Sequence, residues 1–129
     1  MSHIATLSDA ERIAAALALP NNAFINGRFC AAASGDRLTT VNPATGEPLT
    51  QIAACDIRDV NAAVEGARAA FEAGSWRLAH PGERKAVLLK LAALMERELE
   101  SLAVLESLDS GKPVSECLAV DVPETIHVL

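Results

Sequence analysis

Apolar residues recur every three or four positions between residues 81 and 108, with charged residues between them. This period is that of an amphipathic α-helix, so we predict a long helix with Pro81 in its first turn. We expect a break or a bend in this helix between Glu98 and Ser101. Its predicted apolar stripe consists of Leu88, Leu91, Ala92, Met95, Leu99, Leu102, Leu105 and Leu108.

The same helical period predicts a second helix over residues 57–73. Asp56 is suited to cap its first turn, and Gly74 is suited to end it. We expect one face of this helix to pack in the core and its charged side chains to lie away from that face. The core face is Ile57, Val60, Val64, Ala67 and Phe71, and the charged residues are Arg58, Asp59, Glu65 and Arg68.

A shorter helix is predicted near each end of the sequence. At the start, Ser8 and Glu11 have the spacing of a capping box, and we expect the helix to extend to Leu19. At the end, a helix is expected from Pro113 or Val114, with a bend at Pro123. Its apolar stripe consists of Leu118, Val122, Ile126 and Leu129. Because the sequence stops within this stripe, we interpret it as truncated.

Two β-hairpins are predicted before the long helices. In residues 24–29, Asn26 and Gly27 favour the positive φ angles of a type I′ turn. A second hairpin is expected over residues 39–53, with its turn at residues 42–47. The residues alone thus predict a mostly α-helical chain with two N-terminal β-hairpins.

The end of the long helix carries a carboxylate in an unfavourable position. Gly111 and Pro113 are typical of a helix end, and Asp109 lies just before them. The helix dipole disfavours a negative charge there by about 0.3–1 kcal/mol. Lys112 or solvent is the simpler source of compensation, and a bound cation is the alternative.

Composition narrows the possible partners. The chain has 129 residues, of which 50% are hydrophobic and 22% charged, as in globular proteins. Its net charge of −6 gives no electrostatic reason to bind nucleic acid or an anionic membrane, and 3% aromatic residues are few for base stacking. The longest apolar run, residues 13–19, is too short to span a bilayer, and the N-terminus lacks the features of a leader peptide. We therefore expect a cytoplasmic protein.

The sequence has no complete catalytic motif. The patterns GxSxG, HExxH, GxxxxGK[ST] and GxGxxG are absent. Cys30, Cys55 and Cys117 have neither zinc-site nor disulfide spacing, so we expect free thiols, and none lies in a recognisable nucleophile context. On the residues alone, the function stays open.

Five blocks of the sequence, however, resemble the N-terminal part of the aldehyde dehydrogenase superfamily. They occur in the family's order and spacing and together are highly specific. The blocks are FINGRF (24–29), TVNPATGE (40–47), RAAFEAGSW (68–76), PGERKAVLLKLAALME (81–96) and LESLDSGKP (105–113). Within the family, residues 74–113 most resemble the bacterial gamma-glutamyl-gamma-aminobutyraldehyde dehydrogenases of putrescine breakdown.

This resemblance implies an α/β fold with a Rossmann-type cofactor domain. Residues 23–129 would be an incomplete N-terminal part of the NAD(P)-binding domain, and residues 1–22 a helical extension. The implied reaction is oxidation of an aldehyde to a carboxylate with NAD or NADP, through a cysteine thiolate and a glutamate-activated water, in a homodimer or homotetramer. In the family these catalytic and cofactor-contacting residues lie beyond Leu129, and the three cysteines here do not match the cysteine motif. We therefore expect no catalytic or cofactor-binding residue here, and no activity from the chain by itself.

Family members also commonly bind a monovalent cation, Na⁺ or K⁺, near the residues that match Thr40, Val41 and Asp109. A carboxylate and backbone carbonyls suit such a hard cation, which would relieve the charge of Asp109. A further ligand in the family comes from downstream, so the site here would be incomplete. The alternative to a truncated enzyme is a non-enzymatic helical interaction module that kept the family's front end and binds a partner through its apolar stripes.

Overall fold

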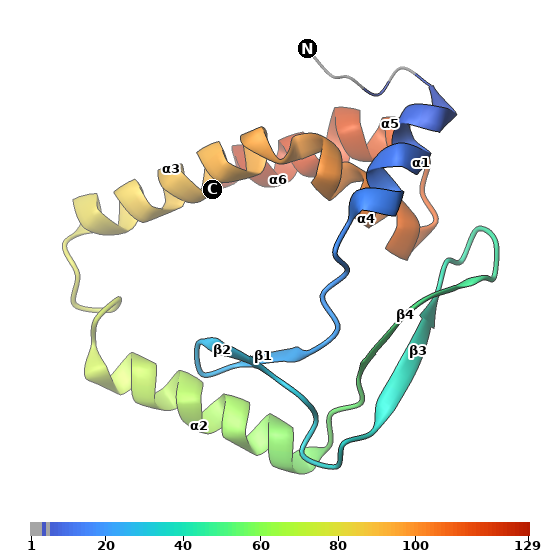
Figure 1. Ribbon diagram of the computed structural model, residues 1–129. Coiled ribbons are helices and arrows are strands. Elements are labelled where there is room, and N and C mark those ends of the chain that lie inside the picture. Colours follow the sequence, from blue (N-terminus) through green and yellow to red (C-terminus); the bar gives the residue numbers. More distant parts are fainter. Residues whose placement is uncertain (1–3, 5) are drawn as a thin grey trace. The chain divides into compact units, whose positions relative to one another are not determined.

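The structure is a computed structural model that describes residue 4 and residues 6–129 (Figure 1). It divides into two compact units, one formed by residues up to 18 with 41–47 and 85–129, the other by residues 19–40 and 48–84. The mostly helical content and the two hairpins agree with the sequence prediction. The elements are α1 (Leu7–Ala16), β1 (Ala23–Ile25), β2 (Arg28–Cys30), β3 (Arg37–Val41), β4 (Pro48–Ala53), α2 (Ile57–Ala73), α3 (Pro81–Arg97), α4 (Leu99–Ser110), α5 (Val114–Glu116), the π-helical turn η1 (Cys117–Asp121) and α6 (Val122–His127).

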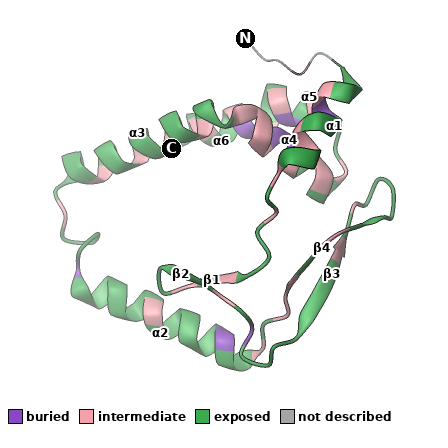
Figure 2. Ribbon diagram, in the orientation of Figure 1, coloured by how far each residue is buried: buried purple, intermediate pink, exposed green. Residues whose placement is uncertain are grey.

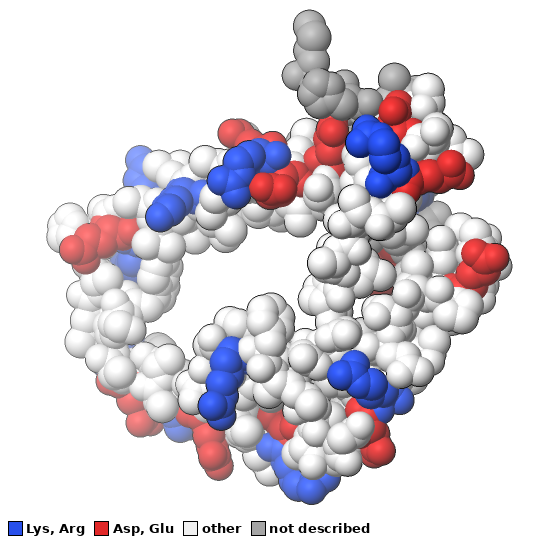
Figure 3. Space-filling model, in the orientation of Figure 1, with Lys and Arg blue, Asp and Glu red and all other residues white. Residues whose placement is uncertain are grey.

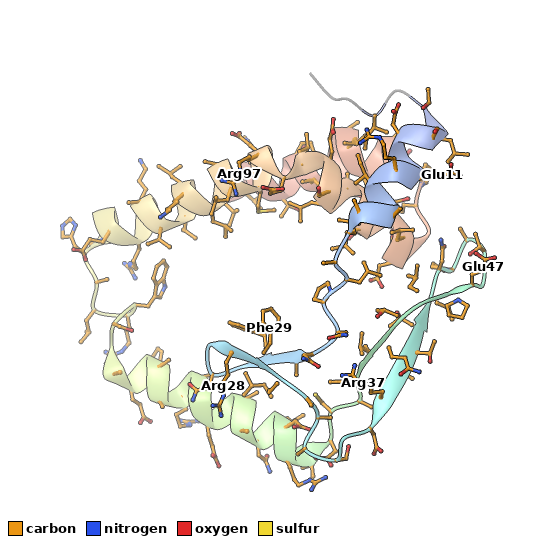
Figure 4. The ribbon with its side chains drawn as sticks, in the orientation of Figure 1. Glu11, Arg28, Phe29, Arg37, Glu47 and Arg97 are labelled. Atoms are coloured by element: carbon orange, nitrogen blue, oxygen red, sulfur yellow. The ribbon has the colours of Figure 1, made fainter. Side chains whose placement is uncertain are left out.

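Both predicted hairpins are confirmed. In the first, β1 and β2 pair antiparallel with Phe24 opposite Phe29, and Asn26 and Gly27 have φ angles of 52° and 77°. These positive angles are those a type I′ turn requires. In the second, β3 pairs with β4. Arg37 of β3, labelled in Figure 4, donates to the carbonyl oxygens of Gln51 at 2.9 Å and Asn21 at 3.4 Å, and so ties the segment before β1 to this hairpin.

Helix α2 has the predicted ends but not the predicted burial. Asp56 caps its first turn, and Gly74 ends it with φ 77°. Asp59, which we expected on the outer side, is buried, with 7% of its surface exposed. Its carboxylate accepts hydrogen bonds from the amides of Ala33 at 2.9 Å and Asp56 at 3.0 Å. The helix is thus anchored through a polar side chain, which explains why its position in the helical pattern gave the wrong prediction.

The apolar stripe of α2 was expected in the core and is instead exposed. Its four large members keep at least half of their surface in contact with solvent. Figure 2 shows the helix as mostly exposed along its length. The helix contacts the first hairpin at Gly66 instead, where an added Cβ would lie 3.4 Å from the side chain of Asn26, in the turn after β1.

Helix α1 begins two residues earlier than predicted. Thr6 is its N-cap: the amide of Asp9 donates to the Thr6 hydroxyl at 3.3 Å, and the amide of Thr6 donates to the Asp9 carboxylate at 3.0 Å. The sequence holds two overlapping capping boxes, and the Thr6–Asp9 pair is used rather than Ser8–Glu11. The helix also ends before Leu19, because Leu17 already has an extended backbone with ψ 126°.

The predicted break in the long helix is confirmed at Glu98, which separates α3 from α4 with φ −99° and ψ 15°. Beyond it lies the core of the first unit, where α4 packs against the C-terminal helices (Figure 2). Ala103 and Cys117 are fully buried there, and Val122 is 6% exposed. The residues packed around them are Leu99, Leu102, Leu118 and Ile126. Three of the four residues in the predicted stripe of the last helix, Leu118, Val122 and Ile126, therefore face the core.

The distortion expected at Pro123 takes the form of the π-helical turn directly before it. The amide of Val122 donates to the carbonyl of Cys117, five residues back. Proline has no amide hydrogen, and its ring would clash with the carbonyl four residues earlier, that of Ala119, so a wider turn accommodates it. The wider turn also places Cys117 and Val122 on one side, facing Ala103.

No described helix is long and apolar enough to cross a membrane. On the face that Figure 3 shows, positive and negative side chains are intermixed rather than gathered by sign.

Candidate cation site

The three residues predicted to hold a cation lie at the end of β3 and in the last turn of α4. Thr40 is half-buried in the second unit, and its hydroxyl donates to the carbonyl of Thr50 at 3.2 Å. Val41, the last residue of β3, is exposed and belongs to the first unit. Asp109, also in the first unit, is exposed.

The turn after Val41 is closed by its own hydrogen bonds. The side-chain oxygen of Asn42 accepts from the amide of Ala44 at 2.9 Å, and its carbonyl accepts from Gly46 at 2.7 Å. The amide of Asn42 donates to the carbonyl of Glu47, which is labelled in Figure 4, at 2.9 Å. These bonds fix the backbone that follows Val41.

The end of α4 lies against this turn. Gly111 ends the helix with φ 76°, and its amide donates to the carbonyl of Ser107 at 3.0 Å. A Cβ added to Gly111 would lie 3.0 Å from Cγ of Pro43, so backbone and turn are in close contact. The first unit therefore brings together the two segments that carry Asp109 and Val41. Asp109 lies two residues before Gly111 in the sequence, and Val41 lies two residues before Pro43.

Lys112, one of the two simpler partners expected for Asp109, is engaged elsewhere. Its Nζ lies 2.9 Å from both carboxylate oxygens of Asp121. This hydrogen bond, followed by the attraction between the two charges, raises the pKa of Lys112. Among residues 6–129, no ion pair involves Asp109. Solvent and a cation remain as partners for its charge.

The donor set fits a hard monovalent cation better than a transition metal. Within the first unit, Asp109 carries a carboxylate and Val41 a backbone carbonyl, the ligand types that hard cations prefer. Within the described part of the chain, no three His, Cys, Asp or Glu residues are grouped so that they could hold a metal ion.

The cysteines are free, as expected, and the pKa values of two of them are unsuited to nucleophilic catalysis. Burial, and then the nearby charge of Asp121, raises the pKa of the Cys117 thiol. Desolvation, and then the charge of Asp59, raises the pKa of Cys55. Reactive cysteines need the opposite shift, because the thiolate is the nucleophile.

The first turns of α1, α2 and α3 do not fit a dinucleotide. Pyrophosphate binds free amides at a helix N-terminus. Here acidic side chains already accept from backbone amides at each start, namely Asp9 in α1, Asp56 and Asp59 in α2, and Glu83 in α3. Their negative charge would also repel phosphate.

Comparison with known proteins identifies the family. The model of the aldehyde dehydrogenase family matches residues 29–129. The chain belongs to the aldehyde dehydrogenase family. This confirms the resemblance carried by the five sequence blocks.

Relatives within this family are much longer. An aminoacetaldehyde dehydrogenase from Pseudomonas aeruginosa is 54% identical over 129 residues, which are 100% of this chain and 26% of that protein. The crystal structure of a gamma-glutamyl-gamma-aminobutyraldehyde dehydrogenase from Burkholderia cenocepacia matches with a TM-score of 0.91 and 45% identity, covering 95% of this chain and 25% of that one. A mutant indole-3-acetaldehyde dehydrogenase from P. syringae, in complex with NAD⁺ and IAA, matches with a TM-score of 0.89 and 42% identity over 93% of this chain and 24% of that one. The chain thus spans about a quarter of the length of these relatives.

Proposed function

We propose that this chain is the N-terminal part of an NAD- or NADP-dependent aldehyde dehydrogenase that oxidises an aldehyde to a carboxylate. The observation that carries the proposal is the 54% identity to the aminoacetaldehyde dehydrogenase over the whole chain. The names of this relative and of the B. cenocepacia structure favour an aminoaldehyde substrate. The resemblance of residues 74–113 extends this class to aldehydes formed in putrescine breakdown. The relative in complex with NAD⁺ supports the cofactor class.

In this proposal, residues 23–129 belong to the NAD(P)-binding domain, and residues 1–22 extend it. The nucleophile and the cofactor contacts come from polypeptide outside these residues. The raised pKa values of Cys55 and Cys117 and the acidic helix starts support this division. The complete enzyme would be a cytoplasmic homodimer or homotetramer.

The proposal includes a structural Na⁺ or K⁺ at Thr40, Val41 and Asp109, completed by a ligand from elsewhere. The cation would offset the charge of Asp109 and tie the turn after β3 to the end of α4. The contact between Gly111 and Pro43 and the engagement of Lys112 by Asp121 support this placement.

A chimaera tests the enzymatic proposal. The 129 residues would replace the segment that they match in the P. aeruginosa aminoacetaldehyde dehydrogenase, and NADH formation from aminoacetaldehyde would be measured. We expect activity from the chimaera and none from the 129-residue chain alone. A folded chimaera without activity would contradict the proposed function, and NADH formation by the chain alone would contradict the proposed location of the active site.

The exposed apolar stripe of α2 favours a second candidate, a non-enzymatic module that binds a partner. This alternative predicts that the chimaera folds but is inactive, and that the chain alone forms a stable complex with a partner.

A further inference from the structure

Two of the cysteines, Cys30 and Cys55, are carried by neighbouring segments of the second unit. Cys30 ends β2, and Cys55 directly precedes Asp56, the N-cap of α2. The carboxylate of Asp59 joins the two segments, because it accepts from the amide of Ala33 at 2.9 Å and from the amide of Asp56 at 3.0 Å. Ala33 follows Cys30 by one short loop, so each thiol lies close in sequence to an amide that this carboxylate holds.

The Cys30 thiol is close enough to affect the ionisation of Cys55. Desolvation is the largest cause of the raised pKa of Cys55, followed by the charge of Asp59 and then by that of a Cys30 thiolate. A second backbone contact joins the same part of the unit, since the amide of Ala54 donates to the carbonyl of Asp36 at 3.0 Å. The fold thus brings together two thiols whose spacing in the sequence gave no indication of a pair.

We propose that Cys30 and Cys55 form a reversible redox site, in which a small disulfide such as oxidised glutathione converts the two thiols into an intramolecular disulfide. Both thiols belong to one unit of this chain, so the proposed disulfide does not depend on the enzymatic function. A disulfide requires two Cα atoms roughly 4.4–6.8 Å apart. Cys55 lies outside any helix or strand, so its backbone is free to adjust to this distance.

The exposure of the two residues sets the order of the steps. Cys55 is exposed and accessible to oxidised glutathione, whereas Cys30 is partly buried. The Cys55 thiolate attacks one sulfur of oxidised glutathione, whose S–S bond breaks and releases one glutathione thiolate. The Cys30 thiolate then attacks the Cys55 sulfur of this mixed disulfide and releases the second glutathione thiolate. Two electrons pass from the protein thiols to the oxidant, and the two thiol protons go to the two glutathione molecules.

Disulfide chemistry fits this pair better than metal binding or catalysis. A structural zinc site needs four ligands, and among the residues that the structure describes no three His, Cys, Asp or Glu are grouped to hold a metal ion. The raised pKa of Cys55 keeps its thiolate fraction low near neutral pH, so its attack is slow. Slow attack suits a site that responds to a lasting change in redox conditions rather than one that turns over. Disulfides of reducing compartments are usually transient and of this sensing kind.

Oxidation of the chimaera with oxidised glutathione tests the proposal. After several hours, the remaining thiols would be alkylated and the disulfides mapped by peptide mass spectrometry without reduction. We expect the peptide that contains Cys30 to be linked to the peptide that contains Cys55, and dithiothreitol to restore both thiols. Cys117, which is fully buried in the other unit, should stay unlinked.

A matched variant separates the two steps. Cys30→Ser should retain glutathione on Cys55, because no second thiol is present to release it. The unsubstituted chimaera should retain roughly tenfold less glutathione there, since the neighbouring thiol acts at a high effective concentration. Equal retention in the two proteins, or a chimaera in which both thiols stay reduced, would overturn the proposal.

Two controls separate an internal disulfide that the fold directs from other cross-links. Oxidation of a mixture of isotopically labelled and unlabelled chimaera should give no linked peptides that combine the two, and mixed pairs would overturn the proposal in favour of a link between chains. In concentrated urea the cross-links should be distributed among several cysteines. A link between Cys30 and Cys55 that is equally frequent in urea would show that the fold does not direct it, and would also overturn the proposal.

Discussion

Replacing Asp59 with alanine removes the two hydrogen bonds that anchor the start of α2. The carboxylate accepts from the amides of Ala33 at 2.9 Å and Asp56 at 3.0 Å, and it is 7% exposed. A hydrogen bond to a charged group contributes roughly 1.5–3 kcal/mol. Because water can reach the freed amide of Ala33, which belongs to an exposed residue, we expect a total loss of about 2–4 kcal/mol in the free energy of unfolding. This is a large part of the stability of a typical domain.

Urea denaturation followed by far-UV circular dichroism would measure this loss. The matched control is Glu65→Ala, which removes the same charge from an exposed position of the same helix. We expect the control to change the free energy of unfolding by less than about 0.5 kcal/mol. If Asp59→Ala and Glu65→Ala have the same small effect, the carboxylate does not anchor α2, and the account of the helix's polar face is wrong.

Four further predictions follow from single contacts. Gly66→Ala should stabilise the chain by up to about 1 kcal/mol in urea denaturation, because helix propensity improves and the 3.4 Å contact is tolerable. Gly111→Ala should destabilise it by about 1–2 kcal/mol in the same assay, since φ is 76° and the added Cβ meets the turn after β3 at 3.0 Å. The pKa of Lys112 is raised above 10.5 in the folded state, so the stability that its ion pair with Asp121 contributes should be complete below pH 10.5 and be lost as the pH rises through the folded pKa. Urea denaturation as a function of pH would measure this decrease in stability, and Asp121→Asn should abolish it. In the chimaera, replacing Na⁺ or K⁺ with a bulky organic cation should lower the Tm, and Asp109→Asn should remove that dependence; a Tm indifferent to the cation would refute the cation site.

Local sequence signals predicted the ends of most elements correctly. Asn26 and Gly27 define the first hairpin, Asp56 and Gly74 bound α2, and Gly111 ends α4. Each of these signals depends on the conformational preferences of one or two residues and their immediate neighbours. Such preferences act whatever the rest of the chain does, so the sequence is sufficient to predict them.

Pairings between distant residues were not predictable in the same way. Asp59 is buried where its carboxylate accepts a hydrogen bond from the amide of Ala33. Lys112 does not compensate Asp109, because its Nζ donates to the carboxylate of Asp121. The second of these pairs also depends on the π-helical turn, whose five-residue hydrogen bond has no counterpart in the usual helical period. The candidate cation site shows the same limit: the residues alone indicated only Asp109, and the family resemblance supplied Thr40 and Val41.

The wrong prediction for the stripe of α2 is the more informative one. An apolar stripe indicates that a helix face is suited to an apolar environment, but not which segment provides it. The part of helix α3 that lies in the other unit gives the same indication independently. Val87, Leu88 and Leu89 are consecutive and cannot share one face, and Val87 and Leu89 are each 55% exposed. A helix that is apolar on several sides is typical of the interior of a larger protein. The two units therefore each contain a helix with apolar surface that the unit itself leaves exposed.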